Sequence, residues 1–248
     1  MSYPPTAPYA PYPPGRAPRR RHPLRITVII LVLLIGLLVA ADFGAKALAE
    51  QVMADQIKSH GFPKKPDVTI QGFPFLTQVA ARDLHTVDIS SADVKEGPLT
   101  ITSIKAALDG VHIDSSFHGG TVDRLAGTVF ISFPAISSAL AQQAGPLGSA
   151  LGNAGMTLQP AGAHSVKATV NVLVTSFSVT WRISVLPGNK ISARLTSSSG
   201  VPGSLLGSIG NITVPLPKLP LGLRVTRLSV TPRGLTGDLG GHNLSFSG

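Results

Sequence analysis

The residues that could do covalent chemistry are few, and they form no familiar catalytic pattern. The chain has no cysteine, which removes thiolate nucleophiles, disulfides and zinc–thiolate sites. It contains no nucleophile elbow, phosphate-binding loop, dinucleotide-binding turn or paired-histidine zinc helix. The nearest approach to a ligand set is His112 with Asp114 and His118. On a strand the first two share a face while His118 falls in a glycine-rich turn, so we expect no metal site, no cofactor and no catalytic residue.

Charge is the stronger signal, because it is distributed unevenly along the chain. From Arg124 onward the only acidic residue is Asp238. The basic residues of that half are Arg124, Lys167, Arg182, Lys190, Arg194, Lys218, Arg224, Arg227 and Arg233. Such a bias predicts a surface that attracts anions such as phospholipid headgroups, with ordinary solubility charge as the alternative. Nucleic acid is a poorer partner, because aromatic residues make up only 5% of the chain.

An uncharged run from Ile26 to Ala41 follows a cluster of arginines that ends at Arg25. A helix of this length, extended past Asp42 by Phe43, can cross a bilayer, and cationic residues stay on the cytoplasmic side. We therefore expect a single-pass anchor over residues 24–42, with the N-terminus inside. A cleaved signal peptide ending near Ala41 is the alternative, and both interpretations export the rest of the chain.

The expected organisation has three parts. Residues 1–23 are rich in proline and tyrosine, a composition that favours extended, disordered chain, so we expect a cytoplasmic tail. The anchor follows, and residues 43–248 form the exported domain. Phe43, Ala47, Leu48, Val52, Met53 and Ile57 recur at helical spacing, which predicts that an amphipathic helix continues the anchor and buries that face.

Beyond this helix, alternating apolar and polar residues indicate mostly strand. The expected strands are Asp67–Gln71, Val79–Ile89, Leu99–Ile113, Leu125–Phe133, Val166–Val174, Phe177–Val185, Lys190–Thr196 and Leu223–Thr231. The apolar phase slips by one residue at Arg227, as a β-bulge would produce. Helices are expected at Pro134–Ala144 and Gly203–Ile209. The fold class is therefore α+β, with a long, curved antiparallel sheet wrapped on helices.

One distinctive motif is the segment Val68–Gln78, in which a strand leads into Gly72-Phe73-Pro74-Phe75-Leu76. Three further segments follow it along the chain: Leu108–Val111, Leu219–Leu223 and Val230–Leu235. With the single N-terminal anchor, the order and spacing of these segments resemble those of the LmeA-like phospholipid-binding proteins of the actinobacterial cell envelope. The resemblance implies a fold akin to tubular lipid-binding domains, binding of phospholipids including phosphoinositides, and support of lipoglycan maturation.

Residues and resemblance together predict an extracytoplasmic, membrane-anchored phospholipid-binding protein that is not an enzyme. The candidate lipid-binding residues are Phe73, Phe75, Leu76 and Trp181 for the acyl chains, and Arg182, Arg194, Arg224 and Arg227 for an anionic headgroup. Two alternatives stay open: a non-catalytic envelope scaffold whose tail binds a cytoplasmic partner, and a glycolipid-modifying enzyme with an unfamiliar site.

The topology can be tested directly. We expect a reporter fused after Gly248 to be active only outside the cytoplasm and one fused before Met1 to behave as cytoplasmic, because the arginines before Ile26 resist translocation. Activity of the C-terminal fusion inside the cytoplasm would contradict this orientation. Retention of the full-length chain in membranes, as opposed to a mature N-terminus near Asp42, distinguishes an anchor from a signal peptide.

Overall fold

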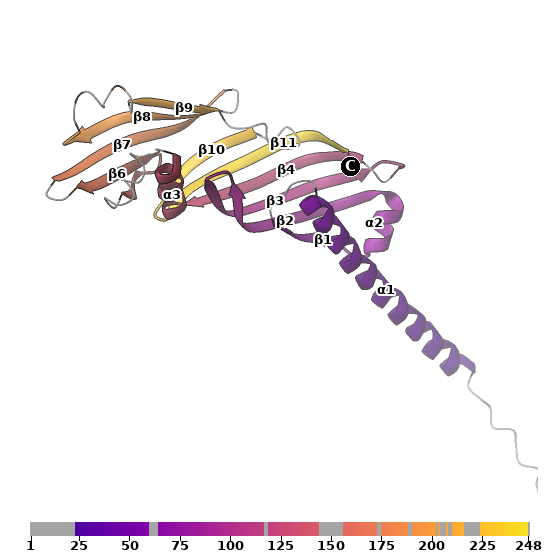
Figure 1. Ribbon diagram of the computed structural model, residues 1–248. Helices are drawn as coiled ribbons and strands as arrows, with labels where there is room; N and C mark the ends of the chain where they lie inside the picture. The colour runs from indigo at the N-terminus through magenta and orange to yellow at the C-terminus, as the bar shows by residue number, and fades with distance from the viewer. Residues whose placement is uncertain are drawn as a thin grey trace, which may run out of the picture. The chain divides into compact units, whose positions relative to one another are not determined.

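The structure, a computed structural model, describes residues 23–59, 64–116, 119–143, 156–172, 175–187, 190–201, 203, 207, 210–215 and 224–247. The expected tail and the segment Leu219–Leu223 lie outside these residues, and so does most of the expected helix Gly203–Ile209. The chain divides into two compact units, Met1–Ala41 and Asp42–Gly248. Figure 1 shows the helices and strands and labels most of them.

Helix α1 (Pro23–Ser59) begins in the first unit and ends in the second. In the first unit its apolar side chains are exposed, with Val28, Ile30 and Leu33 between 51% and 67% accessible. The helix is long and apolar enough to cross a membrane, with a mean hydropathy of 2.7 in its most apolar window. A signal sequence meets the same criterion.

The second unit contains a six-stranded antiparallel sheet in the order β1-β2-β3-β4-β11-β10. Its strands are β1 (Asp67–Gln71), β2 (Asp83–Glu96), β3 (Leu99–Ile113), β4 (Gly119–Ser132), β10 (Arg224–Thr231) and β11 (Gly234–Ser247). Two helices accompany it, α2 (Phe75–Ala81) between β1 and β2, and α3 (Phe133–Gln143) after β4. The turn between β10 and β11 lies in the Val230–Leu235 motif, and Arg233 O there accepts a hydrogen bond from Phe133 N at 3.0 Å.

A second antiparallel sheet has the order β5-β6-β7-β8-β9. Its strands are β5 (Thr157–Gly162), β6 (Ser165–Val172), β7 (Thr175–Leu186), β8 (Lys190–Ser199) and β9 (Asn211–Pro215). The α+β class is thus confirmed, with the strands shared between two sheets instead of one. The bulge expected near Arg227 is also confirmed, because the register of β10 against β11 shifts between Val225 and Arg227.

The expected strand Val79–Ile89 is wrong at its start. Residues up to Ala81 belong to α2, and Arg82 closes that helix in a left-handed conformation with φ 57°. Its backbone N–H donates to the carbonyl oxygens of Gln78 and Val79, which ends the helix before β2 begins. Short apolar runs do not distinguish a buried strand from a short helix, and here a local cap decides.

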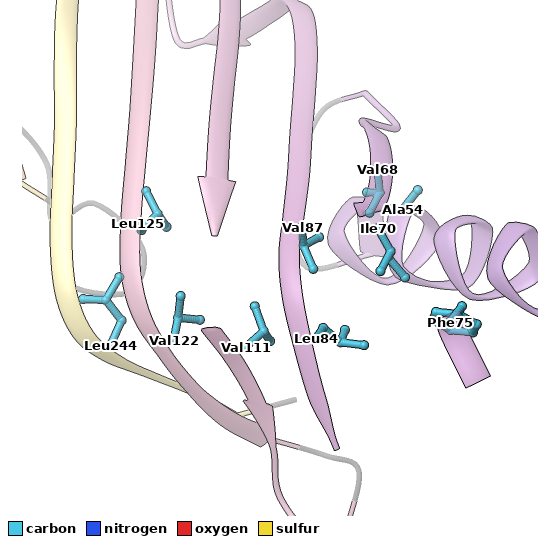
Figure 2. Packing of buried hydrophobic residues seen from close by; sticks show 10 residues of the cluster. All are labelled: Ala54, Val68, Ile70, Phe75, Leu84, Val87, Val111, Val122, Leu125 and Leu244. Carbon is cyan, nitrogen blue, oxygen red and sulfur yellow. The ribbon is translucent and has the colours of Figure 1, made fainter. Parts of the chain in front are cut away.

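The core lies on one face of the six-stranded sheet (Figure 2). The cluster comprises Ala54, Val68, Ile70, Phe75, Leu84, Val87, Val111, Val122, Leu125 and Leu244. Leu84, Val111, Val122 and Leu244 are cross-strand neighbours and form one row of it. A second row of neighbours contains Val87, Leu108 and Leu125.

These two rows are three residues apart on every strand, although strict alternation places residues three apart on opposite faces. The alternation is interrupted at the same level in all four strands, where one residue of each strand has no cross-strand partner. These residues are His85, Gly110, Asp123 and Asn243. Gly110 has φ 64° and Asn243 has φ 50°, in the left-handed region that glycine and asparagine tolerate best. We call this line of four residues the crease, and it lets both apolar rows face the same side.

The part of α1 in the second unit packs on this core along one side. Ala54 belongs to the cluster, and Ala45, Ala49, Met53 and Ile57 pack against it. The expected face is therefore partly wrong, since Phe43, Leu48 and Val52 are 56–64% exposed.

Two acidic residues select the face that packs. Asp42 is 4% exposed, and its carboxylate accepts hydrogen bonds from the backbone N–H groups of Phe75 at 2.9 Å and Leu76 at 2.7 Å. Glu50 accepts one from the N–H of Ile70 at 2.8 Å. Because 42, 45, 49, 50, 53 and 57 share one side of a helix, satisfying these carboxylates turns the alanines, Met53 and Ile57 inward and leaves Leu48 and Val52 exposed.

We expect Asp42→Asn to lower the free energy of unfolding by about 1–3 kcal/mol. The oxygen of an asparagine side chain can still accept a hydrogen bond from one of the two N–H groups. Its NH₂ group would face the other N–H group, and two donors cannot form a hydrogen bond. The matched control is Asp55→Asn, because the Asp55 side chain is 65% exposed and its ion pair with Lys65 is a surface contact worth less than about 1 kcal/mol. Denaturant unfolding of the full-length protein in detergent measures both, and equal destabilisation would contradict the role given to Asp42.

Candidate functional site

The apolar face of the six-stranded sheet continues past the buried cluster, where it is only half covered. Ala106 pairs with Gly127, and Gly127 pairs with Leu239. Two residues further on, Ile104 pairs with Val129 on the same face. Ile104, Val129 and Leu239 are all half-buried. Strands β3, β4 and β11 therefore present an apolar surface with small residues in its middle and larger ones beside them.

The two sheets meet at the turn between β5 and β6. In this turn His164 O accepts a hydrogen bond from Ile183 N of β7, and Ala163 O accepts one from Val230 N of β10, each at 2.8 Å. The ring nitrogen Nδ1 of His164 also lies 3.1 Å from the carbonyl oxygen of Leu228. The turn thus joins β7 of one sheet to β10 of the other, and we call this junction the seam.

An open cleft of about 720 Å³ lies at the seam. Its lining comes from the turn at residues 161–165, from Arg182–Val185 of β7 and from Thr226–Leu228 of β10. Arg182 and Arg227, both expected to bind a headgroup, line this one cleft although 45 positions separate them in the chain. The volume is within the range of pockets that hold small organic ligands.

Arg182 belongs to a polar row that crosses the five-stranded sheet. Ser165, Arg182, Arg194 and Asn211 are successive cross-strand partners, so they share one face. Arg182 and Arg194 are both exposed, and the described residues give neither an ion pair. Two like charges directly opposite each other destabilise a sheet. A bound anion would relieve that repulsion.

Arg227 is presented by the bulge of β10. The extra residue is Thr226, whose hydroxyl donates to the carbonyl oxygen of Asp238 at 3.1 Å. The Arg227 side chain is 76% exposed, and its guanidinium lies 4.0 Å from the carboxylate of Asp238, a long contact that leaves most of its charge available. Arg224 is exposed opposite Gly240 and does not line the cleft.

The four apolar candidates are not gathered in one place. Phe75 is 4% exposed within the core, whereas Phe73 and Leu76 beside it are 60% and 43% exposed. Trp181 is half-buried in the other sheet, between Val166 of β6 and Leu195 of β8. An apolar side chain found by type alone can serve core or ligand, and burial separates these cases.

Sequence reasoning missed His164 and the apolar surface around Ala106. The hydrogen bonds of the His164 turn connect β7 and β10, which are far apart in the sequence, so no local pattern could reveal them. The alternation in β3 was visible, but which part of that face the helices would leave uncovered was not.

His112 does not join Asp114 in a ligand set. Its ring lies 3.5 Å from the carboxylate of Asp83 and 3.3 Å from that of Asp123, while Asp114 caps its own turn through Ser116. His118 lies outside the described residues. Within the part of the chain that the structure describes, no three histidine or acidic side chains are grouped so that they could hold a metal ion.

Comparison with known proteins supplies the remaining evidence. No curated protein matches the chain, and no solved structure does. The family model described as LmeA-like phospholipid-binding matches residues 40–239. This range contains the seam, the whole five-stranded sheet and the six-stranded sheet up to the middle of β11. The chain therefore belongs to the LmeA-like phospholipid-binding family.

Proposed function

We propose that this protein is a membrane-anchored, extracytoplasmic phospholipid-binding protein that holds acyl chains on the half-covered face of the six-stranded sheet and the headgroup at the seam. The single observation that carries the proposal is the cleft in which Arg182 and Arg227 meet. Membership of a phospholipid-binding family supports the lipid-binding role.

The apolar part of the site follows from the energetics of burial. Each methylene of an acyl chain that leaves water contributes about 0.8 kcal/mol, so a few methylenes against Ile104, Val129 and Leu239 give substantial binding. The small residues Ala106 and Gly127 lie between these larger side chains. A Cβ atom added at Gly127 would lie 3.6 Å from that of Ala106 and 3.5 Å from that of Leu239, which shows how closely the three positions are grouped.

The polar part of the site selects an anionic headgroup, either an ordinary anionic phospholipid or a phosphoinositide. Guanidinium groups match phosphate oxygens with two parallel hydrogen bonds. Arg182 and Arg227 supply them within the cleft, and Arg194 adds positive charge from the next strand. Leu228 lines the same cleft, and its partner Gly237 lies on the apolar face of β11, whereas Arg227 pairs with Asp238 on the opposite face. The two parts of the site therefore adjoin at Leu228, on the edge strand β10.

The anchor and the cellular role complete the proposal. Residues 24–42 hold the protein in the cytoplasmic membrane with its N-terminus inside, and residues 43–248 form the lipid-binding domain in the envelope. This placement rests on the apolar helix and on the arginines before it. There the protein supports maturation of envelope lipids or lipoglycans by binding, without catalysis of its own.

A matched pair of alanine substitutions tests the apolar part. Ala106→Phe should keep most of the stability but weaken binding of a fluorescent phospholipid several-fold, because it fills the half-covered face. Ala168→Phe should lower the free energy of unfolding by about 1–3 kcal/mol, because Ala168 is 6% exposed and tightly packed. Titration with the lipid and denaturant unfolding give the two readouts. Unchanged lipid affinity in a folded Ala106→Phe protein would refute the acyl surface.

Charge neutralisation tests the polar part. The double variant Arg182→Gln/Arg227→Gln should reduce the preference for short-chain phosphatidylglycerol over phosphatidylcholine about tenfold at low salt, with a smaller effect at high salt. The matched control is Lys190→Gln/Arg233→Gln, which removes the same charge from exposed positions away from the cleft. Equal losses in both variants would show that net charge, not the seam, sets the preference.

A further inference from the structure

Most of the exposed large apolar side chains described in the second unit belong to two segments of the chain. Its described residues include eight large apolar side chains that are exposed, and five belong to α1 or to the segment that leads into α2. These five are Phe43, Leu48, Val52, Phe73 and Leu76. Leu48 and Val52 follow Phe43 by five and nine residues, so they point to other sides of α1. Phe43, Phe73 and Leu76 are held together by the ring stack and by the hydrogen bonds of Asp42, and an exposed apolar group of this kind marks an interaction surface.

Two aromatic rings form the centre of the group. Phe43 of α1 and Phe73 before α2 stack with their centroids 5.9 Å apart and their planes 24° apart. They are 58% and 60% exposed, so the stack protects only part of each ring from water. Leu76, at 43% exposed, follows Phe73 by three residues.

The group is held rigidly. Between Phe73 and Leu76, the side chain of Phe75 is buried in the core. The carboxylate of Asp42, the residue before Phe43, accepts the backbone N–H groups of Phe75 and Leu76. The same interaction therefore fixes α1 and the Phe73 segment to each other. Binding through these side chains then costs little additional conformational entropy, because their backbone is already ordered.

The position of Phe43 in the chain identifies the occupant. The apolar run ends at Ala41, two residues earlier in the same helix, and two residues of helix rise by about 3 Å. If the helix spans a bilayer, Phe43 emerges at its surface. Aromatic residues are enriched at this boundary because one side of the ring can contact acyl chains while the rest meets the headgroups.

We propose that Phe43, Phe73 and Leu76 form a docking surface that inserts into the headgroup–acyl boundary of the bilayer beside the point where α1 emerges. The proposal rests on the membrane anchoring stated above and goes beyond it. An anchor alone tethers the domain, whereas this surface fixes one end of the six-stranded sheet against the membrane. A phospholipid could then reach the apolar face of the sheet without crossing water.

The test measures the depth of single tryptophan reporters in the full-length protein reconstituted into phosphatidylglycerol–phosphatidylcholine vesicles. The background is Trp181→Phe, which removes the only native tryptophan. Phe73→Trp places the reporter in the docking surface. Leu186→Trp is the matched control, because Leu186 is also an exposed apolar residue, 38% accessible, but at the end of β7. Phospholipids brominated close to the headgroup serve as quenchers.

We expect the reporter at position 73 to be quenched at least threefold more strongly than the reporter at position 186, in proteins that float with the vesicles. Flotation with equal quenching at both positions would overturn the docking surface and leave the anchor intact. A blue-shifted reporter at 73 that is not quenched would show that protein covers it, which also overturns the proposal. Failure to float would instead refute the anchor, and the docking surface with it.

Discussion

The second unit depends on a buried carboxylate at its first residue. Asp42 interrupts the apolar sequence of α1, and burying a charge is costly unless hydrogen bonds compensate it. The N–H groups of Phe75 and Leu76 provide that compensation. Once it is made, the direction in which α1 packs is determined, with the alanines against the core and Phe43 outside. The same contact holds the segment before α2, so the core and the exposed aromatic pair have a common cause.

The crease is the second constraint, and it shapes the sheet that presents the apolar surface. The alternation of faces is interrupted by one residue at the same level in four neighbouring strands, at His85, Gly110, Asp123 and Asn243, while the register between the strands is unchanged. An interruption in one strand alone would turn part of its apolar set toward water. Because all four strands are interrupted together, the rows on both sides stay on the core face. The buried cluster can then pass without a break into the half-covered surface around Ala106.

Much of this fold is predictable from local patterns, and the exceptions have physical reasons. Alternation gave the bounds of β1 and β3, and the phase slip at Arg227 located the bulge. By contrast, the helical spacing of apolar residues between positions 43 and 57 predicted that Phe43 and Leu48 belong to the packing face. Such a pattern cannot include the hydrogen bonds that Asp42 and Glu50 accept from distant backbone N–H groups. In the same way, the sequence shows the excess of basic residues after Arg124. It does not show that the His164 turn brings Arg182 and Arg227 to one cleft.

The central claim is that the second unit carries phospholipid. Mass spectrometry of the lipid that stays bound to the full-length protein after purification in detergent tests this claim most directly. The reference is an unrelated single-pass protein purified from the same membranes. We expect phospholipid close to one molecule per chain, enriched in anionic species over that reference. A lipid content and composition equal to those of the reference would contradict the account, and would mean that the apolar face of the sheet is simply core.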